Sequence, residues 1–93
     1  FRKGDVIGRM GGDEFLVYIR GSIPRESLEQ RLTHFLEQLR TNSHNMLTCS
    51  MGLTLVTSEH FDYARSLSQA DTAMYHSKRH GKNNFSFFED LNV

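Results

Sequence analysis

The chain has 93 residues and a formal net charge of +0, because eleven Lys and Arg balance eleven Asp and Glu. This length suits one domain with a single core, and the 38% hydrophobic share indicates a chain that folds. The charge balance argues against a nucleic acid polymer as partner, since non-specific binding of that kind depends on a strong basic field. A single cysteine, Cys49, excludes an internal disulfide and favours a reducing, cytoplasmic setting.

A β-hairpin is predicted over residues 5–20, where two apolar runs flank Gly11-Gly12-Asp13-Glu14. A helix is predicted next, with Ser22 as N-cap and Pro24 in the first turn, and it extends to about Arg40. Its apolar residues recur at helical spacing, so one side of the helix should face the core. They are Leu28, Leu32, Phe35, Leu36 and Leu39.

The second half of the chain predicts a strand, a helix and a strand. Residues 46–56 alternate between apolar and small or polar residues, with Gly52 leaving room for the close approach of a backbone or a ligand. A helix is predicted over residues 63–79, with Gly81 as its C-terminal cap, and a strand over residues 85–88. The whole chain, 1–93, is therefore expected to form a single α+β unit with two helices packed on a mixed, mainly antiparallel sheet.

The most informative segment is Met10-Gly11-Gly12-Asp13-Glu14-Phe15. Two adjacent carboxylates repel each other and gain nothing from packing at a hairpin tip, whereas the glycines allow a ligand to approach the backbone. This combination suits a divalent cation that carries phosphates, because Mg²⁺ favours carboxylate and phosphate oxygens. Read without its context, the same segment is simply a solvated turn.

Four ordered motifs resemble the GGDEF family, the diguanylate cyclases that join two GTP into cyclic di-GMP. Residues 11–15 resemble the signature itself, and Arg2-Lys3-Gly4-Asp5 resembles the family's R-x-x-D motif at its usual offset. Residues 47–52 resemble the central strand, and residues 71–83 resemble the last helix and its basic turn. The resemblance implies the palm-like fold of nucleotidyl cyclases, with this chain a partial domain that lacks the N-terminal half.

The resemblance also implies roles for the residues of the hairpin turn. It makes Asp13 and Glu14 the catalytic acids and the ligands of Mg²⁺ or Mn²⁺, with Asp13 more directly tied to activating the attacking 3′-hydroxyl. Gly11 and Gly12 would accommodate GTP at close range.

Basic residues would bind substrate and product. Lys78 matches the family lysine that contacts the terminal phosphates, and Lys82 stands where many members carry Arg. Arg2 and Asp5 match the site at which cyclic di-GMP inhibits the enzyme. Two residues of the first long helix are candidates for a third basic residue there: Arg25 and Arg31.

Some of these residues have simpler interpretations. The basic residues around Lys78 could merely complement the helix dipole, and Arg2 with Asp5 could be a surface ion pair. His76 and His80 stand four residues apart, as metal ligands on a helix can, but no third ligand is marked for them and they are expected to be solvated.

Two functional classes follow. The first is an enzyme that condenses two GTP by metal-assisted attack, working as a homodimer of GGDEF protomers and joined to an upstream sensory domain or membrane region. The isolated fragment is expected to be inactive, because the resemblance places the guanine pocket and another metal ligand outside it. The alternative is a non-catalytic module that binds cyclic di-GMP or dimerises.

Overall fold

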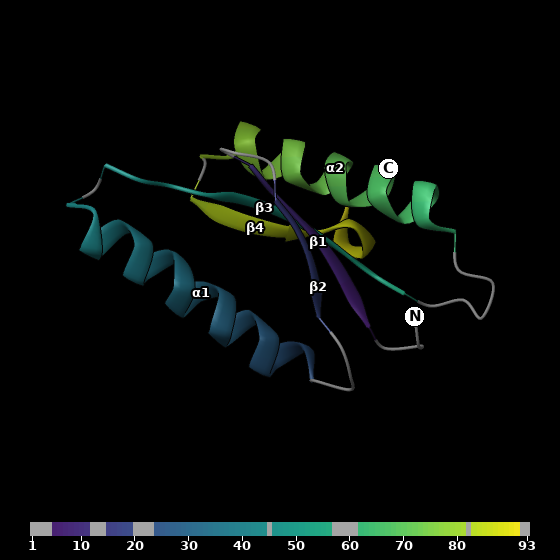
Figure 1. Ribbon diagram of the computed structural model, residues 1–93, viewed down its shortest axis with the longest axis horizontal. Helices are drawn as coiled ribbons and strands as arrows, with labels where there is room; N and C mark the ends of the chain where they lie inside the picture. Colours follow the sequence, from purple (N-terminus) through teal and green to yellow (C-terminus); the bar gives the residue numbers. More distant parts are fainter. Residues whose placement is uncertain are drawn as a thin grey trace.

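The computed structural model describes residues 5–11, 15–19, 24–44, 46–56, 62–81 and 83–91. Within them the secondary structure follows the predicted order of strand, strand, helix, strand, helix and strand. Figure 1 shows a sheet with one helix on each of its faces. The elements are β1 (Val6–Gly11), β2 (Phe15–Ile19), α1 (Arg25–Asn42), β3 (Ser50–Leu55), α2 (Tyr63–Arg79), β4 (Asn84–Phe87) and the 3₁₀ turn η1 (Phe88–Asp90).

The four strands lie in the order β2-β1-β3-β4. Strand β1 pairs antiparallel with both β2 and β3, whereas β3 and β4 run parallel. The α+β class and the mixed, mainly antiparallel sheet are thus confirmed. Strand β3 begins at Ser50, later than residue 46, because the strand ladders with β1 and β4 both begin at Ser50.

Helix α1 covers the apolar face of the sheet. Leu28, Leu32 and Leu36 are buried in one cluster with residues from three strands, among them Leu53 and Phe87. The prediction that Phe35 faces the core is wrong, since its side chain is 42% exposed. The buried leucines recur every fourth residue, and Phe35, one position before Leu36, is turned by roughly 100° away from that row.

The ends of the helices show which capping predictions were right. Pro24 occupies the N-cap position of α1, with φ −55° and ψ 140°, so it precedes the first turn and does not belong to it. The predicted N-cap, Ser22, lies outside the described residues. At the end of α2, His80 is the C-cap and Gly81 follows with φ +109°, a conformation that favours glycine.

Helix α2 packs against the other face of the sheet. Its inward side carries Ala70, Ala73 and Ser77, all fully buried. A Cβ atom added to Gly52 would lie 2.0 Å from the amide nitrogen of Met74 and 2.1 Å from the carbonyl oxygen of Ala70. The close approach predicted at Gly52 is therefore that of the α2 backbone.

Cys49 behaves as a small buried hydrophobic residue. It belongs to the core cluster beneath α1, and burial raises the pKa of its thiol. The thiol is therefore protonated at neutral pH and serves as a packing group.

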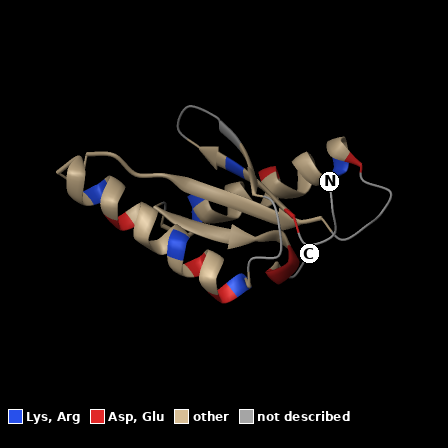
Figure 2. Ribbon diagram, turned by 60° about the horizontal axis from the view of Figure 1, so that its bottom comes forward, with Lys and Arg blue, Asp and Glu red and all other residues tan. Residues whose placement is uncertain are grey.

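Charged residues gather on the outside of the helices. Figure 2 shows that basic and acidic residues alternate along the α1 ribbon, with few on the strands beneath it. No helix among the described residues combines the length and the apolar character that crossing a membrane requires.

Candidate functional site

The structure brings two of the predicted site residues together at the end of β1. A Cβ atom added to Gly11 would lie 2.7 Å from Cε and 3.2 Å from Nζ of Lys78, which belongs to the last turn of α2. The ammonium group therefore lies against the backbone of Gly11, the last residue of β1. Any residue larger than glycine at position 11 would displace this side chain.

A second contact between β1 and α2 lies nearby. The guanidinium Nε of Arg9 is 3.3 Å from Oδ1 of Asp71, two turns before Lys78 on the same helix. Asp71 belongs to the segment 71–83 that resembles the family's last helix, but nothing in the sequence reveals that it pairs with Arg9. The contact holds α2 across the strand that ends in Gly11.

Asp5 is fully buried just before β1. Its Oδ2 accepts a hydrogen bond from the hydroxyl of Tyr18, and its carbonyl oxygen accepts one of 2.8 Å from the amide of Val56. A buried carboxylate needs such donors. Its role in product inhibition stays a prediction, and Arg2 lies outside the described residues.

Four other predicted site residues also lie outside the described residues: Gly12, Asp13, Glu14 and Lys82. The described part of the chain holds no group of three or more His, Cys, Asp or Glu residues placed to bind a metal ion. The predicted metal ligands follow Gly11 in the sequence by two and three positions.

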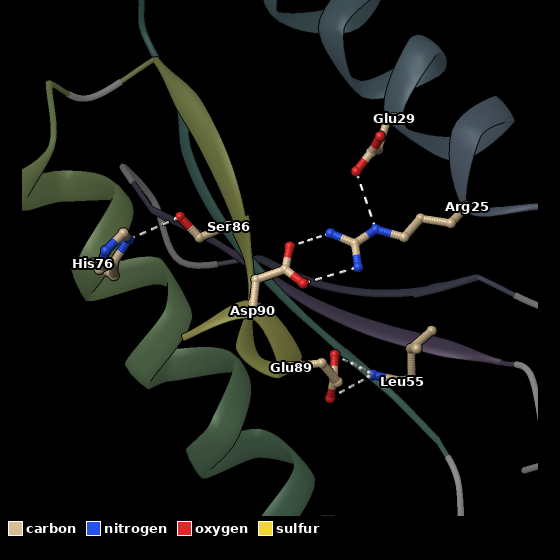
Figure 3. A network of polar contacts seen from close by, with 7 residues as sticks. All are labelled: Arg25, Glu29, Leu55, His76, Ser86, Glu89 and Asp90. Carbon is tan, nitrogen blue, oxygen red and sulfur yellow. Dashed lines mark hydrogen bonds and ion pairs between the residues drawn. The ribbon is translucent and has the colours of Figure 1, made fainter. Parts of the chain in front are cut away.

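Arg25 is engaged at the start of α1 (Figure 3). Its two terminal nitrogens donate to the two carboxylate oxygens of Asp90 in η1, one of them at 3.0 Å, and its Nε donates to Glu29 at 3.0 Å. The guanidinium also lies over the ring of Phe87, 4.2 Å from its centroid. The other candidate, Arg31, forms no ion pair within the described part of the chain.

Sequence reasoning missed the contribution of η1. Besides Asp90, its Glu89 accepts a hydrogen bond of 2.8 Å from the hydroxyl of Thr54 and one of 3.3 Å from the amide of Leu55. Through Glu89 and Asp90, η1 therefore connects the end of β3 to the start of α1. Two adjacent acids directly after the last strand were the only signal in the sequence.

An open groove of about 870 Å³ lies beside the edge strand β4. Helix α2 forms one wall with Tyr75, His76, Arg79 and His80, and Arg25 contributes from α1. Because Lys78 is directed toward Gly11 on the other side of α2, this groove is separate from the contact between the lysine and the turn.

Comparison with known proteins identifies the family. The family described as "Diguanylate cyclase, GGDEF domain" matches residues 1–84 of the chain. The chain belongs to the GGDEF family. The matched residues include the signature, the R-x-x-D motif and Lys78, whereas η1 follows the end of the match.

Several curated proteins contain a similar GGDEF region. The bifunctional diguanylate cyclase/cyclic di-GMP phosphodiesterase MucR of Pseudomonas aeruginosa is 33% identical over 92 residues, or 95% of this chain. The probable diguanylate cyclase DgcC of Escherichia coli K12 is 37% identical over 88% of the chain. The cyclic di-GMP phosphodiesterase PdeR of the same strain is 34% identical over 89% of the chain.

These relatives are much longer than the GGDEF chain. It spans 13% of the length of MucR and of PdeR and 23% of the length of DgcC. No solved structure matches the chain closely enough to count as a relative.

Proposed function

We propose that this GGDEF domain takes part in the synthesis of cyclic di-GMP from two GTP. The observation that carries the proposal is the contact of Lys78 with Gly11. This contact puts a cation beside Gly11, which precedes Gly12 and the two acids in the sequence, and a cation there would suit the phosphates of a nucleoside triphosphate. The names of MucR and DgcC, which both include diguanylate cyclase, support the same activity.

In the proposed reaction the chain's own residues bind and orient the substrate. Lys78 and Lys82 hold the terminal phosphates of GTP, and Gly11 and Gly12 let the nucleotide lie close to the backbone. The 3′-hydroxyl of one GTP attacks the α-phosphorus of the other, and pyrophosphate leaves. Two protomers facing each other would each bring one nucleotide, which turns a bimolecular encounter into a positioned one.

The acidic pair fits a hard divalent cation. Asp13 and Glu14 supply carboxylate oxygens, the ligands that Mg²⁺ and Mn²⁺ prefer. When bound, such a cation neutralises the charge that develops on the phosphates. Asp13 would also lie closest to the hydroxyl that must lose its proton.

The acids are tested in a version of the protein extended at its N-terminus. Asp13→Asn or Glu14→Gln is expected to lower cyclic di-GMP formation on the order of a thousandfold, because each removes one charge from a cation and phosphate site. The measurement is product formation from GTP with Mg²⁺, followed by chromatography. Glu26→Gln, an exposed acid in the first turn of α1, is the matched control and should leave the rate unchanged. A Glu14→Gln variant of normal rate would show that the acids are wrongly assigned.

Arg2 and Asp5 are proposed to hold cyclic di-GMP as an inhibitor. In the Arg2→Ala variant, the rate with added cyclic di-GMP is then expected to be nearly equal to the rate without it. The reason is that the variant loses a cation that binds phosphate or guanine. The assay compares initial rates over a series of cyclic di-GMP concentrations. If Arg2→Ala leaves the inhibition as strong as before, Arg2 does not hold the product.

The second candidate is a non-catalytic module that binds cyclic di-GMP or dimerises. The phosphodiesterase PdeR favours it, because its name includes no cyclase activity although it contains a similar region. The extended protein separates the two candidates. Binding of cyclic di-GMP without any turnover of GTP would support the module, whereas turnover that depends on Glu14 supports the cyclase.

A further inference from the structure

Alternate residues of β1 face helix α2, and each of them meets a residue of that helix. The pairs are Ile7 with Ala70 in one buried cluster, Arg9 with Asp71 in an ion pair, and Gly11 with Lys78 in the contact described above. Successive side chains of a strand point to opposite faces, so these three residues of β1 share one face. Helix α2 is therefore attached along the whole strand that ends in Gly11.

The ion pair is the directional contact of this row. Nε of Arg9 lies 3.3 Å from Oδ1 of Asp71, and both atoms are buried although 46% of the Asp71 side chain is exposed. Apolar packing has no preferred direction, so it sets how closely the helix approaches the strand and leaves the helix free to slide or rotate. Two opposite charges at fixed positions resist both movements, and salt screens a buried pair little.

Asp71 and Lys78 lie on the same side of α2. They are seven residues apart, which separates them by about 10.5 Å along the helix axis and by only about 20° around it. Arg9 and Gly11 likewise share one face of β1, roughly 7 Å apart. A change in the position of Asp71 relative to β1 is therefore passed along the helix to the point from which the Lys78 side chain extends.

A second polar contact holds the same helix to the other strands. The hydroxyl of Ser77 donates to the carbonyl oxygen of Met51 at 2.7 Å and lies 2.7 Å from the hydroxyl of Ser86. Nδ1 of His76 is 3.1 Å from Ser86 Oγ, so the expectation that His76 is simply solvated is wrong. These contacts attach α2 to β3 and β4, whereas the ion pair with Arg9 attaches it to β1.

From this geometry we propose that Asp71 is a positioning residue, which sets Lys78 against Gly11 through its ion pair with Arg9. The inference rests on the proposed binding of the terminal phosphates of GTP by Lys78. Asp71 acts through the lysine and not on the substrate. A misplaced lysine weakens the binding of GTP in the ground state and in the transition state alike, so the KM for GTP rises while kcat changes little.

The first test is the steady-state kinetics of the N-terminally extended protein with GTP and Mg²⁺. Asp71→Asn should raise the KM for GTP by about threefold or more and leave kcat within about twofold. Lys78→Ala should also raise the KM, and Asp71→Asn added to Lys78→Ala should change it by less than about 1.5-fold. A rise in KM that is equal with and without Lys78 would show that Asp71 does not act through the lysine, which overturns the proposal.

The matched control for Asp71→Asn is Thr72→Ala. Thr72 is the next residue of α2 and is exposed, and its hydroxyl bonds to the carbonyl oxygen of Ser68 on the same helix. The control should leave the KM for GTP unchanged within about 1.5-fold. An effect of Thr72→Ala as large as that of Asp71→Asn would point to a general disturbance of the helix and would overturn the proposal.

Arg9→Gln separates positioning from a simple effect of charge. Either Arg9→Gln or Asp71→Asn breaks the ion pair, so both should raise the KM for GTP. Asp71→Asn also removes a negative charge near the phosphates, which by itself would strengthen their binding. If Asp71→Asn lowers the KM while Arg9→Gln raises it, the effect is one of charge and the positioning role is overturned.

A measurement without nucleotide keeps the inference separate from the proposed function. In the 93-residue chain, the amide NMR signal of Gly11 reports the position of the Lys78 ammonium group. Lys78→Ala should move this signal, and Asp71→Asn should move it in the same direction, but not when Lys78 is already replaced. An extended protein that does not turn over GTP would overturn the proposed function alone. A Gly11 signal that Asp71→Asn leaves in place would overturn the positioning role, whether or not GTP is turned over.

Discussion

Gly52 is the residue at which the fold tolerates no side chain. The three atoms nearest to an added Cβ, at 2.0, 2.1 and 2.7 Å, all belong to the backbone of α2 and cannot rotate away. A methyl group there must push the helix off the sheet. This distinguishes Gly52 from Gly11, where the nearest atoms belong to the flexible end of Lys78.

Gly52→Ala is accordingly expected to destabilise the chain by more than about 3 kcal/mol, at or beyond the upper end for overpacking a core. The measurement is the free energy of unfolding from urea denaturation followed by circular dichroism. Gly8→Ala on β1 is the matched control, because its nearest neighbour is a methyl carbon of Leu53 at 3.2 Å that can move by a rotamer adjustment. We expect it to cost about 1 kcal/mol or less. Equal effects of the two substitutions would contradict the account of Gly52.

At the scale of elements, η1 joins α1 to the sheet through the Arg25–Asp90 ion pair. The hydrogen bond from the Arg25 guanidinium holds the pKa of Asp90 below its ordinary value of 3.8. The folded chain therefore favours the carboxylate form. The ion pair stabilises the folded chain fully at pH values well above 3.8. This stabilisation is lost as the pH falls through the lowered pKa of Asp90.

A double-mutant cycle with Arg25→Ala and Asp90→Asn measures this contribution. Because both side chains are about half exposed, we expect a coupling of about 0.5–1 kcal/mol at pH 7 that disappears at low pH. The measured quantity is the free energy of unfolding of the four variants at each pH. A parallel cycle with Arg25→Ala and Glu26→Gln, an acid of the same turn, should show no coupling at either pH. A coupling that is unchanged in acid would exclude the ion pair as its source.

The elements differ in how well the sequence predicts them. Helix α2 was placed at its observed bounds, because apolar spacing and a terminal glycine are local signals. Phe35 was misplaced because periodicity cannot tell how wide the buried stripe of a helix is. The ion pair between Arg25 and Asp90 could not be predicted from the sequence, because no spacing rule relates two exposed charges that are 65 residues apart.

The candidate site was predictable in its chemistry but not in its contacts. Motif resemblance selected Gly11 and Lys78 separately, whereas their contact depends on how α2 lies across β1. The hydrogen bond between His76 of α2 and Ser86 of β4 depends likewise on how these two elements pack together. Such relations arise from packing between elements and are absent from any one segment.

For the whole molecule, strands β2 and β4 form the two edges of the described sheet. Edge strands offer unpaired backbone groups to another chain. We therefore expect the 93-residue chain to associate into dimers or larger species and to show no measurable cyclase activity by itself. Light scattering over a range of concentrations checks the first expectation, and a GTP turnover assay checks the second. A strict monomer, or turnover by the bare chain, would contradict them.

The order of the strands also has a kinetic consequence. Strands β1 and β2 form one local unit, and β3, α2 and β4, which follow one another in the chain, form a second. The contacts within each unit join residues that are close in the sequence, so only short loops must close when either unit forms. The ladder between β1 and β3 joins them across the whole of α1. Closing that long loop is the slow, entropically opposed step, so folding should be limited by the docking of two preformed halves at the centre of the sheet.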